Sequence, residues 1–253
     1  MALIGQNAQP GDVLLLDGPE QKTLFEIYHP PGLDYRFISP DSVLTDERAE
    51  YDFPMLIAGY QRAWLVLYGE PKTYDPDHRA EAWLASKGYK AFYQSYLGNY
   101  VTLFAFSGSP AESTLNSIDA PFEGGPRLIG YALEPATLQP GQTLYVTLQW
   151  LATDPMPVDY TVFTHLLNSS GVLVTQTDSQ PLSGTRPTSS WKPGEVITDR
   201  YALLLPPELE AGDYQIEVGL YDLASLNRLV ISQPGGALDQ LDHLILGAVK
   251  ISP

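Results

Sequence analysis

The amino-acid sequence predicts two fold classes in one chain: a small, mostly parallel α/β domain followed by an antiparallel β-sandwich. Three observations lead to this expectation. Apolar runs alternate with helical spacings in the first part, a polar stretch follows, and apolar residues then recur with a period of two. We expect the α/β domain at 1–108, a linker at 109–126 and the sandwich at 127–253.

The first part begins with "GDVLLLDGPEQKTLFEIYHP", where an apolar run passes through Gly-Pro into a helical spacing. "DYRFIS" predicts a short strand, and "RAWLVLYGE" predicts a strand buried on both faces. "DPDHRAEAWLASKG" predicts a helix that has Asp75 as its N-cap, Pro76 as its first residue and Gly88 as its stop. "YKAFYQSY" and "NYVTLFAFS" then predict an antiparallel pair.

The polar stretch "SGSPAESTLNSIDAPFEGG" contains few large apolar residues and is rich in Ser, Pro and Gly. Such a composition is typical of a linker that runs over the surface.

The last part shows the alternation of half-buried strands. "TLYVTLQW" alternates Leu144, Val146, Leu148 and Trp150 with polar neighbours, and "DYQIEVGLYD" does the same from Tyr214 onward. About seven or eight such segments predict a sandwich that is immunoglobulin- or fibronectin-like, or like a carbohydrate-binding module. The spacing in "LEAGDY" further predicts that the hydroxyl of Tyr214 closes a corner of the sandwich.

Composition limits the partners of the chain. Its 253 residues carry 30 acidic and 14 basic side chains, a formal charge of -16. This charge repels phosphate backbones, so we expect no nucleic-acid partner. The chain has no cysteine and no apolar run long enough to span a bilayer, so we expect a soluble fragment without thiolate metal sites. Because "ALIGQNAQPGD" resembles the end of a helix entering a strand, we expect Met1 to be an added start on a piece of a longer protein.

No catalytic pattern stands out. Nucleophile-elbow, P-loop and dinucleotide motifs do not occur, and the four histidines have no metal-ligand spacing. We therefore expect no catalytic residue, no metal and no cofactor. In the α/β part, Asp17 follows the first strand, where such sheets bind ligands, and it is a candidate ligand contact. The alternative is that Gly18 and Pro19 only begin a helix.

The segment "GTRPTSSWKPGEV" places one tryptophan, Trp191, in a loop rich in proline and glycine. In one interpretation the ring is an open platform for a sugar, with Arg186, Ser190 and Lys192 bonding its hydroxyls. In the other interpretation the ring is a plug that anchors the loop against the end of the sandwich, with its indole N–H reaching a nearby carbonyl.

Two segments carry a family resemblance: "QPGDVLLLDGPEQKTLFEIYHP" and "RAWLVLYGEPKTYDPDHRAEAWLASKGYKAFYQSYLGNYVTLFAF". The order of these segments resembles the soluble tail of membrane-embedded glycosyltransferases of the dolichyl-phosphate-mannose protein mannosyltransferase and aminoarabinose transferase type. The resemblance implies that transmembrane helices precede an α/β domain on the extracytoplasmic face of the membrane, with a β-sandwich appended in some bacterial members. The family's catalytic acidic residues lie in a loop that this chain does not contain, so no catalytic residue is carried over.

The implied function is that of a non-catalytic accessory region of a glycosyltransferase with a lipid-linked sugar donor. Its expected partners are the transmembrane region of the parent protein and a glycan or the lipid-linked sugar. Two alternatives remain open: a secreted protein with a carbohydrate-binding module, and a small-molecule enzyme with its site near Asp17.

Overall fold

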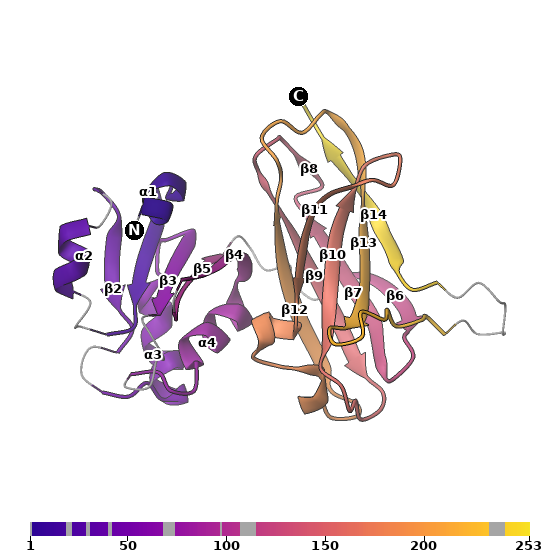
Figure 1. Ribbon diagram of the computed structural model, residues 1–253, viewed down its shortest axis with the longest axis horizontal. Helices are drawn as coiled ribbons and strands as arrows, with labels where there is room; N and C mark the ends of the chain where they lie inside the picture. Colours follow the sequence, from indigo (N-terminus) through magenta and orange to yellow (C-terminus); the bar gives the residue numbers. More distant parts are fainter. Residues whose placement is uncertain are drawn as a thin grey trace. The chain divides into compact units, whose positions relative to one another are not determined.

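The computed structural model describes residues 2–18, 22–28, 31–39, 42–67, 74–96, 98–106, 115–232 and 241–253. The fold is mostly β, and the chain divides into two compact units, Met1–Ser109 and Pro110–Pro253 (Figure 1). None of the helices in the described ranges is both long enough and apolar enough to cross a membrane.

The first unit is a sheet with the strand order β2-β1-β3-β5-β4 and four helices. Its elements are α1 (Ala2–Asn7), β1 (Asp12–Leu16), α2 (Lys22–Tyr28), β2 (Asp34–Phe37), α3 (Asp46–Leu56), β3 (Arg62–Leu67), α4 (Arg79–Lys87), β4 (Tyr89–Tyr96) and β5 (Asn99–Ala105). Strand β1 pairs in parallel with β2 and β3, whereas β5 pairs antiparallel with β3 and β4. The sheet is therefore mixed rather than mostly parallel, because the hairpin of β4 and β5 adds two antiparallel pairings.

Helices cover the sheet of the first unit. Ile4 of α1 and Phe25 of α2 share a core with Leu14, Leu16 and Trp64 on one face. Among the described residues, none from α3 or α4 belongs to this core. These two helices contact each other through Phe53 and Trp83, whose ring centroids are 5.1 Å apart.

Helix α4 begins at Arg79, three residues later than the sequence predicts, and its N-cap position is His78 rather than Asp75, although Asp75 still bonds the first turn from four residues before Arg79. The Asp75 carboxylate accepts the backbone N–H groups of Arg79 (2.8 Å) and Ala80 (2.9 Å). The helix ends at Gly88 as expected. Burial raises the pKa of Asp75, and these two N–H groups partly offset that rise.

The second unit has two sheets, with strand orders β12-β9-β7-β6 and β11-β10-β13-β14-β8. Its elements are β6 (Asn116–Pro121), β7 (Pro126–Glu134), β8 (Thr137–Leu138), β9 (Thr143–Ala152), β10 (Tyr160–Leu167), β11 (Leu173–Ser179), η3 (Pro181–Gly184), η4 (Thr188–Ser190), β12 (Val196–Leu204), β13 (Gly212–Asp222) and β14 (Leu244–Ile251). The pairings are antiparallel except that β8 runs parallel to β14.

One core joins the two sheets. The predicted alternation is confirmed in β9 and β13, whose alternate residues are buried in that core: Leu144, Val146, Leu148, Trp150, Tyr214, Ile216, Val218 and Leu220. At the start of β13 the hydroxyl of Tyr214 donates to the carbonyl of Glu210 at 2.9 Å. Tyr214 thus closes a corner, as its motif predicts.

The interpretation of 109–126 as a linker needs correction. Asn116–Pro121 forms β6, which pairs with β7, whereas 107–114 lie outside the described residues. Few side chains of this segment reach the core: Ala120 and Phe122 are buried, and Ile118 packs against the core while partly exposed. The small number of large apolar residues predicted a linker here, but an edge strand needs only a few of them.

Candidate functional site

Trp191 lies inside the second unit, in the loop formed by residues 180–195, which we call the Trp191 loop. Its ring is 3% exposed and belongs to the shared core. The indole N–H donates to the carbonyl of Arg186 at 3.0 Å. This is the arrangement expected of a plug, and it leaves no open ring face for a sugar.

The contacts of Arg186, Ser190 and Lys192 lie within the Trp191 loop, whereas the hydroxyl of Thr188 bonds the carbonyl of Val158 and the backbone N–H of Tyr160 outside it. Arg186 Nη2 lies 2.6 Å from Glu195 Oε1, and the backbone N–H of Lys192 donates to Glu195 Oε2 at 3.0 Å. The hydroxyl of Ser190 donates to the carbonyl of Pro187 at 2.7 Å. The ion pair with Arg186 lowers the pKa of Glu195. Arg186, Ser190 and Lys192 thus lie close to Trp191, but their contacts stabilise the loop itself.

A buried carboxylate holds the first turn of the Trp191 loop. Asp199 is fully buried, and its Oδ1 accepts the backbone N–H groups of Leu182 (2.9 Å) and Arg200 (3.0 Å). The hydroxyl of Tyr201 donates to its Oδ2 at 2.5 Å. Leu182 and Ser183 both have left-handed backbones, with φ of 50° and 60°, which are uncommon for non-glycine residues. Burial raises the pKa of Asp199 to about 6, although these three donors oppose the rise.

Asp17 follows β1 and is buried. The segments after the three parallel strands include 19–21, 40–41 and 68–73, which lie outside the described residues. A ligand contact at Asp17 therefore stays a prediction.

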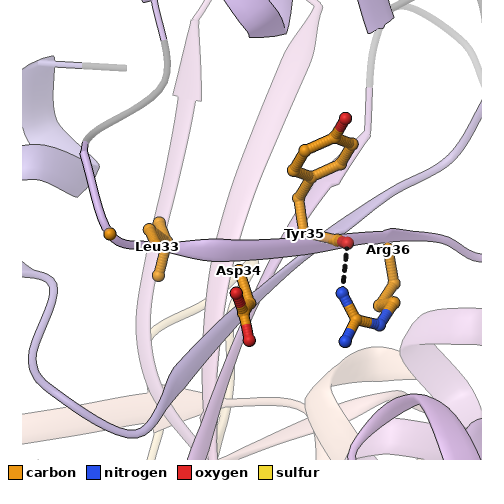
Figure 2. A pocket seen from close by; sticks show the side chains of 5 residues that line it. Leu33, Asp34, Tyr35 and Arg36 are labelled. Carbon is orange, nitrogen blue, oxygen red and sulfur yellow. Dashed lines mark hydrogen bonds between the residues drawn. The ribbon is translucent and has the colours of Figure 1, made fainter.

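A shallow depression of about 560 Å³ lies along β2 and is lined by residues 32–36. Asp34 and Arg36 extend to one side of the strand and Tyr35 to the other (Figure 2). Arg36 donates to the carbonyl of Tyr35 (2.8 Å) and to the hydroxyl of Tyr60 (3.2 Å), which itself donates to Asp34 at 2.5 Å. The polar groups of the depression are thus engaged with one another.

A larger polar and aromatic group lies on the outer face of the five-stranded sheet, where β10, β11 and β13 lie side by side (Figure 1). We call it the outer-face cluster, and it consists of Phe163, His165, Asp178, Glu217, Tyr221, Arg228, Asp242 and His243. Register explains how the strands bring it together, because His165 lies opposite Glu217 and Phe163 lies opposite Asp178 on one side and Gly219 on the other.

Glu217 is the centre of the ionic contacts in the outer-face cluster. Its Oε2 lies 3.1 Å from Nδ1 of His165, and its Oε1 accepts from Nη1 of Arg228 at 3.1 Å. His243 Nδ1 lies 3.6 Å from the same Oε1 and 2.7 Å from Oδ1 of Asp242. The contact with His243 lowers the pKa of Asp242.

His165 lies between two carboxylates. Besides Glu217, Asp178 approaches it, with Oδ1 at 3.4 Å from Nε2. Burial lowers the pKa of His165, but the neighbouring carboxylates of Asp178 and Glu217 outweigh burial, so the net effect is a raised pKa. The hydroxyl of Tyr221 also reaches Asp178, at 3.5 Å from Oδ2.

Phe163 lies beneath the charged groups. A Cβ added to Gly219 would lie 2.4 Å from Cζ of Phe163, so the ring extends directly over this glycine. The guanidinium carbon of Arg228 lies 4.3 Å from the centroid of the ring. The Phe163 side chain is therefore covered, with its residue 1% exposed, whereas the Arg228 and Asp242 side chains above it are 35% and 43% exposed.

The cluster supplies hydrogen-bond donors and acceptors around flat rings, which suits the recognition of a polar ligand. It carries three carboxylates against one guanidinium and two imidazoles. Within the described residues, no group of three or more side chains of His, Cys, Asp or Glu has an arrangement that could hold a metal ion.

Sequence reasoning missed the outer-face cluster. The histidines appear scattered along the sequence, and nothing local relates His165 to Asp178, Glu217 or Arg228. In the structure, residues 161–166 of β10 are buried without interruption, although the segment "TVFTHL" contains the polar residues Thr161, Thr164 and His165. A histidine within such a strand needs polar partners.

No protein-family model matches the chain, and no curated protein sequence matches it. Among solved structures, the chain is similar to the C-terminal domain of wzt, with 16% identity and a TM-score of 0.37 over 55% of this chain and 79% of that one. It is also similar to a β-glucosidase from Listeria innocua in complex with glucose, with 13% identity and a TM-score of 0.29 over 53% of this chain and 16% of that one. A β-glucuronidase from Bacteroides uniformis matches with 14% identity and a TM-score of 0.29, over 53% of this chain and 18% of the enzyme. At these low TM-scores, none of the likenesses bears on the function of this chain.

Proposed function

We propose that the chain is a non-catalytic accessory region on the extracytoplasmic side of a membrane-embedded glycosyltransferase with a lipid-linked sugar donor. Its partners in this proposal are the transmembrane region of the parent protein and a glycan or the lipid-linked sugar. The order of the two units agrees with the order that the resemblance implies. The reaction itself takes place outside this chain.

We further propose that the second unit is a β-sandwich of the immunoglobulin or fibronectin type, or of the carbohydrate-binding-module type. The support is one core shared by two sheets and the corner closed by Tyr214. In such a fold, the outer face of a sheet is available for recognition.

The outer-face cluster is the observation that carries the recognition role. Sugars present hydroxyl groups, which need donors and acceptors at fixed positions, and flat apolar ring faces, which pack on aromatic side chains. The cluster has both kinds of group: the partly exposed side chains of Arg228, Asp242 and His243, and the neighbouring rings of Phe163 and Tyr221, of which Phe163 lies under Arg228. The Trp191 loop offers no comparable surface because its ring belongs to the core between the two sheets, whereas the ring of Phe163 lies outside that core, beneath the partly exposed side chain of Arg228.

Titration calorimetry of the purified chain with a panel of neutral and acidic oligosaccharides tests this function. We expect weak binding, with a dissociation constant on the order of 1 mM, which corresponds to about -4 kcal/mol. Asp242→Asn should weaken this binding because it removes a charged acceptor from the exposed rim of the cluster. Asp119→Asn is the matched control, since Asp119 forms an exposed ion pair with Arg127 between β6 and β7.

A chain that binds no member of the panel would contradict the recognition role. The reading frame upstream of Met1 tests the parent protein separately. About a dozen predicted membrane spans would support the glycosyltransferase, with roughly 20 apolar residues in each span. A signal peptide alone would support the secreted alternative.

A further inference from the structure

Arg228 holds the place on Phe163 that a stacked ligand would take. Its guanidinium, a flat group of donors, lies over the ring with the guanidinium carbon 4.3 Å from the ring centroid. Guanidinium groups and sugar rings both pack face to face on aromatic side chains, and both bond carboxylates at their edges. In this structure the edge of the guanidinium bonds Glu217 at 3.1 Å and approaches Asp242 at 3.6 Å.

Two further rings lie beside the ring of Phe163. The centroid of Phe163 lies 4.8 Å from that of His165, with 35° between the planes, and 6.3 Å from that of Tyr221, with 39° between the planes. The three rings come from β10 and β13 and form a row across the outer face. Asp178 and Glu217 lie beside this row as acceptors.

The Arg228 side chain can move away from Phe163 while the backbone on either side of it stays in place. The backbone next to Arg228 is fixed, because Asp222 donates to the carbonyl of Asn227 (3.0 Å) and Leu229 donates to that of Leu220 (2.8 Å). The Arg228 side chain itself is 35% exposed, and its charged end can be hydrated after it leaves the ring. A rotation of this one side chain would therefore remove the guanidinium from the ring face, while the carbonyl oxygen of Asp242, 2.9 Å from a Cβ added to Gly219, would stay beside the ring.

We propose that Phe163 is the stacking platform of a sugar-binding site, that Arg228 closes this site in the unbound protein, and that the ligand is a neutral, hydroxyl-rich sugar. This inference rests on the recognition role proposed above. Uronates and phosphorylated sugars are disfavoured because Asp178, Glu217 and Asp242 repel a further anion when Arg228 moves away. The formal charge of -16 on the chain acts in the same direction.

Calorimetry with mannotetraose and with tetragalacturonate, on the wild-type chain and on Arg228→Ala, tests the proposal. Arg228→Ala should bind mannotetraose about two- to fivefold more tightly, the fold-change that corresponds to a cation–π contact of about 0.5–1 kcal/mol. Tetragalacturonate should bind more weakly than mannotetraose to both proteins.

Two further variants complete the design. Phe163→Leu should abolish the binding of mannotetraose, and Tyr221→Ala, which changes a less buried ring, serves if the Phe163 variant does not fold. Arg127→Ala is the matched control, because Arg127 pairs with a carboxylate on another sheet and should leave the affinity unchanged.

Each outcome is decisive. Weaker binding of mannotetraose to Arg228→Ala would make Arg228 a ligand contact; weaker or unchanged binding would overturn the closed-site proposal, while the recognition role would stand. Tighter binding of tetragalacturonate would overturn the ligand class. No binding of either sugar to any variant would reject the inference together with the recognition role.

Discussion

The second unit contains two clusters that combine aromatic rings with carboxylates, and they differ in what their polar groups contact. Beneath the Trp191 loop, Asp199 and Tyr201 of β12 are buried, and Asp199 has three donors around it. In the outer-face cluster, Arg228 and Asp242 remain partly exposed, and the contact between them is long at 3.6 Å.

This difference separates a structural cluster from one that can bind. A buried carboxylate with all its donors in place stabilises one conformation of the loop it holds, because removing any partner leaves an unpaired polar group. A partly exposed set of charges can exchange a protein partner for a ligand at little cost, since water and ligand compete for the same groups. The predictions that follow test this distinction, in order of expected effect.

Trp191→Ala should have the largest effect on stability. The free energy of unfolding should fall by roughly 3–5 kcal/mol, as large aromatic truncations in cores do. Trp191→Phe should cost less, because it keeps most of the ring and loses mainly the bond to the Arg186 carbonyl. Urea unfolding followed by circular dichroism measures both. A midpoint and slope equal to those of the wild type would rule out the plug.

Gly219→Ala should have the next largest effect. Its Cβ would lie 2.4 Å from Cζ of Phe163 and 2.9 Å from the carbonyl oxygen of Asp242, so the ring and the segment above it must both shift. We expect a loss of roughly 1–3 kcal/mol, typical of an overpacked site. Gly247→Ala is the control, since its nearest neighbour is the Leu133 side chain at 3.6 Å. Equal stability of the two variants would contradict the placement of Phe163.

Asp199→Asn should change how stability depends on pH. The pKa of Asp199 is about 6 in the folded protein, above the value of about 3.9 expected in the unfolded chain. Its contribution is therefore complete below about pH 4 and is lost as the pH rises to about 6. The wild type should lose stability relative to Asp199→Asn over this window. Parallel pH profiles of the two proteins, measured by urea unfolding, would show that Asp199 is not held as described.

Asp178→Asn should have the smallest effect on stability and a clear effect on His165. Asp178 is one of the two carboxylates that raise the pKa of this histidine, so the variant should lower it, which an NMR titration of the ring measures. Because the folded pKa is raised, His165 stabilises the fold below its usual pKa of about 6.5, and this contribution is lost as the pH rises through the folded value. An unchanged pKa in the variant would show that Asp178 does not act on His165.

Local sequence patterns predict two parts of the fold: the strands with alternating apolar residues and the corner closed by Tyr214. The alternation in β9 and β13 identifies core residues because a strand turns successive side chains to opposite faces. The Tyr214 corner was predictable for a similar reason, since it closes within five residues.

Pairing between distant strands was not predictable in the same way. β6 and the residue after it contribute Ile118, Ala120 and Phe122 to the core, and the segment resembles a linker in composition. The outer-face cluster depends on register, which places His165 opposite Glu217 although 52 residues separate them. Trp191 stands out in the sequence because a tryptophan is unusual in a loop rich in proline and glycine. A charge pair between two distant strands leaves no local pattern.

The most direct test of the central claim is to titrate the isotope-labelled chain with mannotetraose and to follow its amide and indole N–H signals by NMR. The claim is that the outer face recognises a sugar and the Trp191 loop does not. We predict that the amide signals of Phe163, His165, Glu217 and Tyr221 shift with added sugar, while the indole signal of Trp191 stays in place. A shift of the Trp191 indole with unchanged signals on the outer face would contradict the claim.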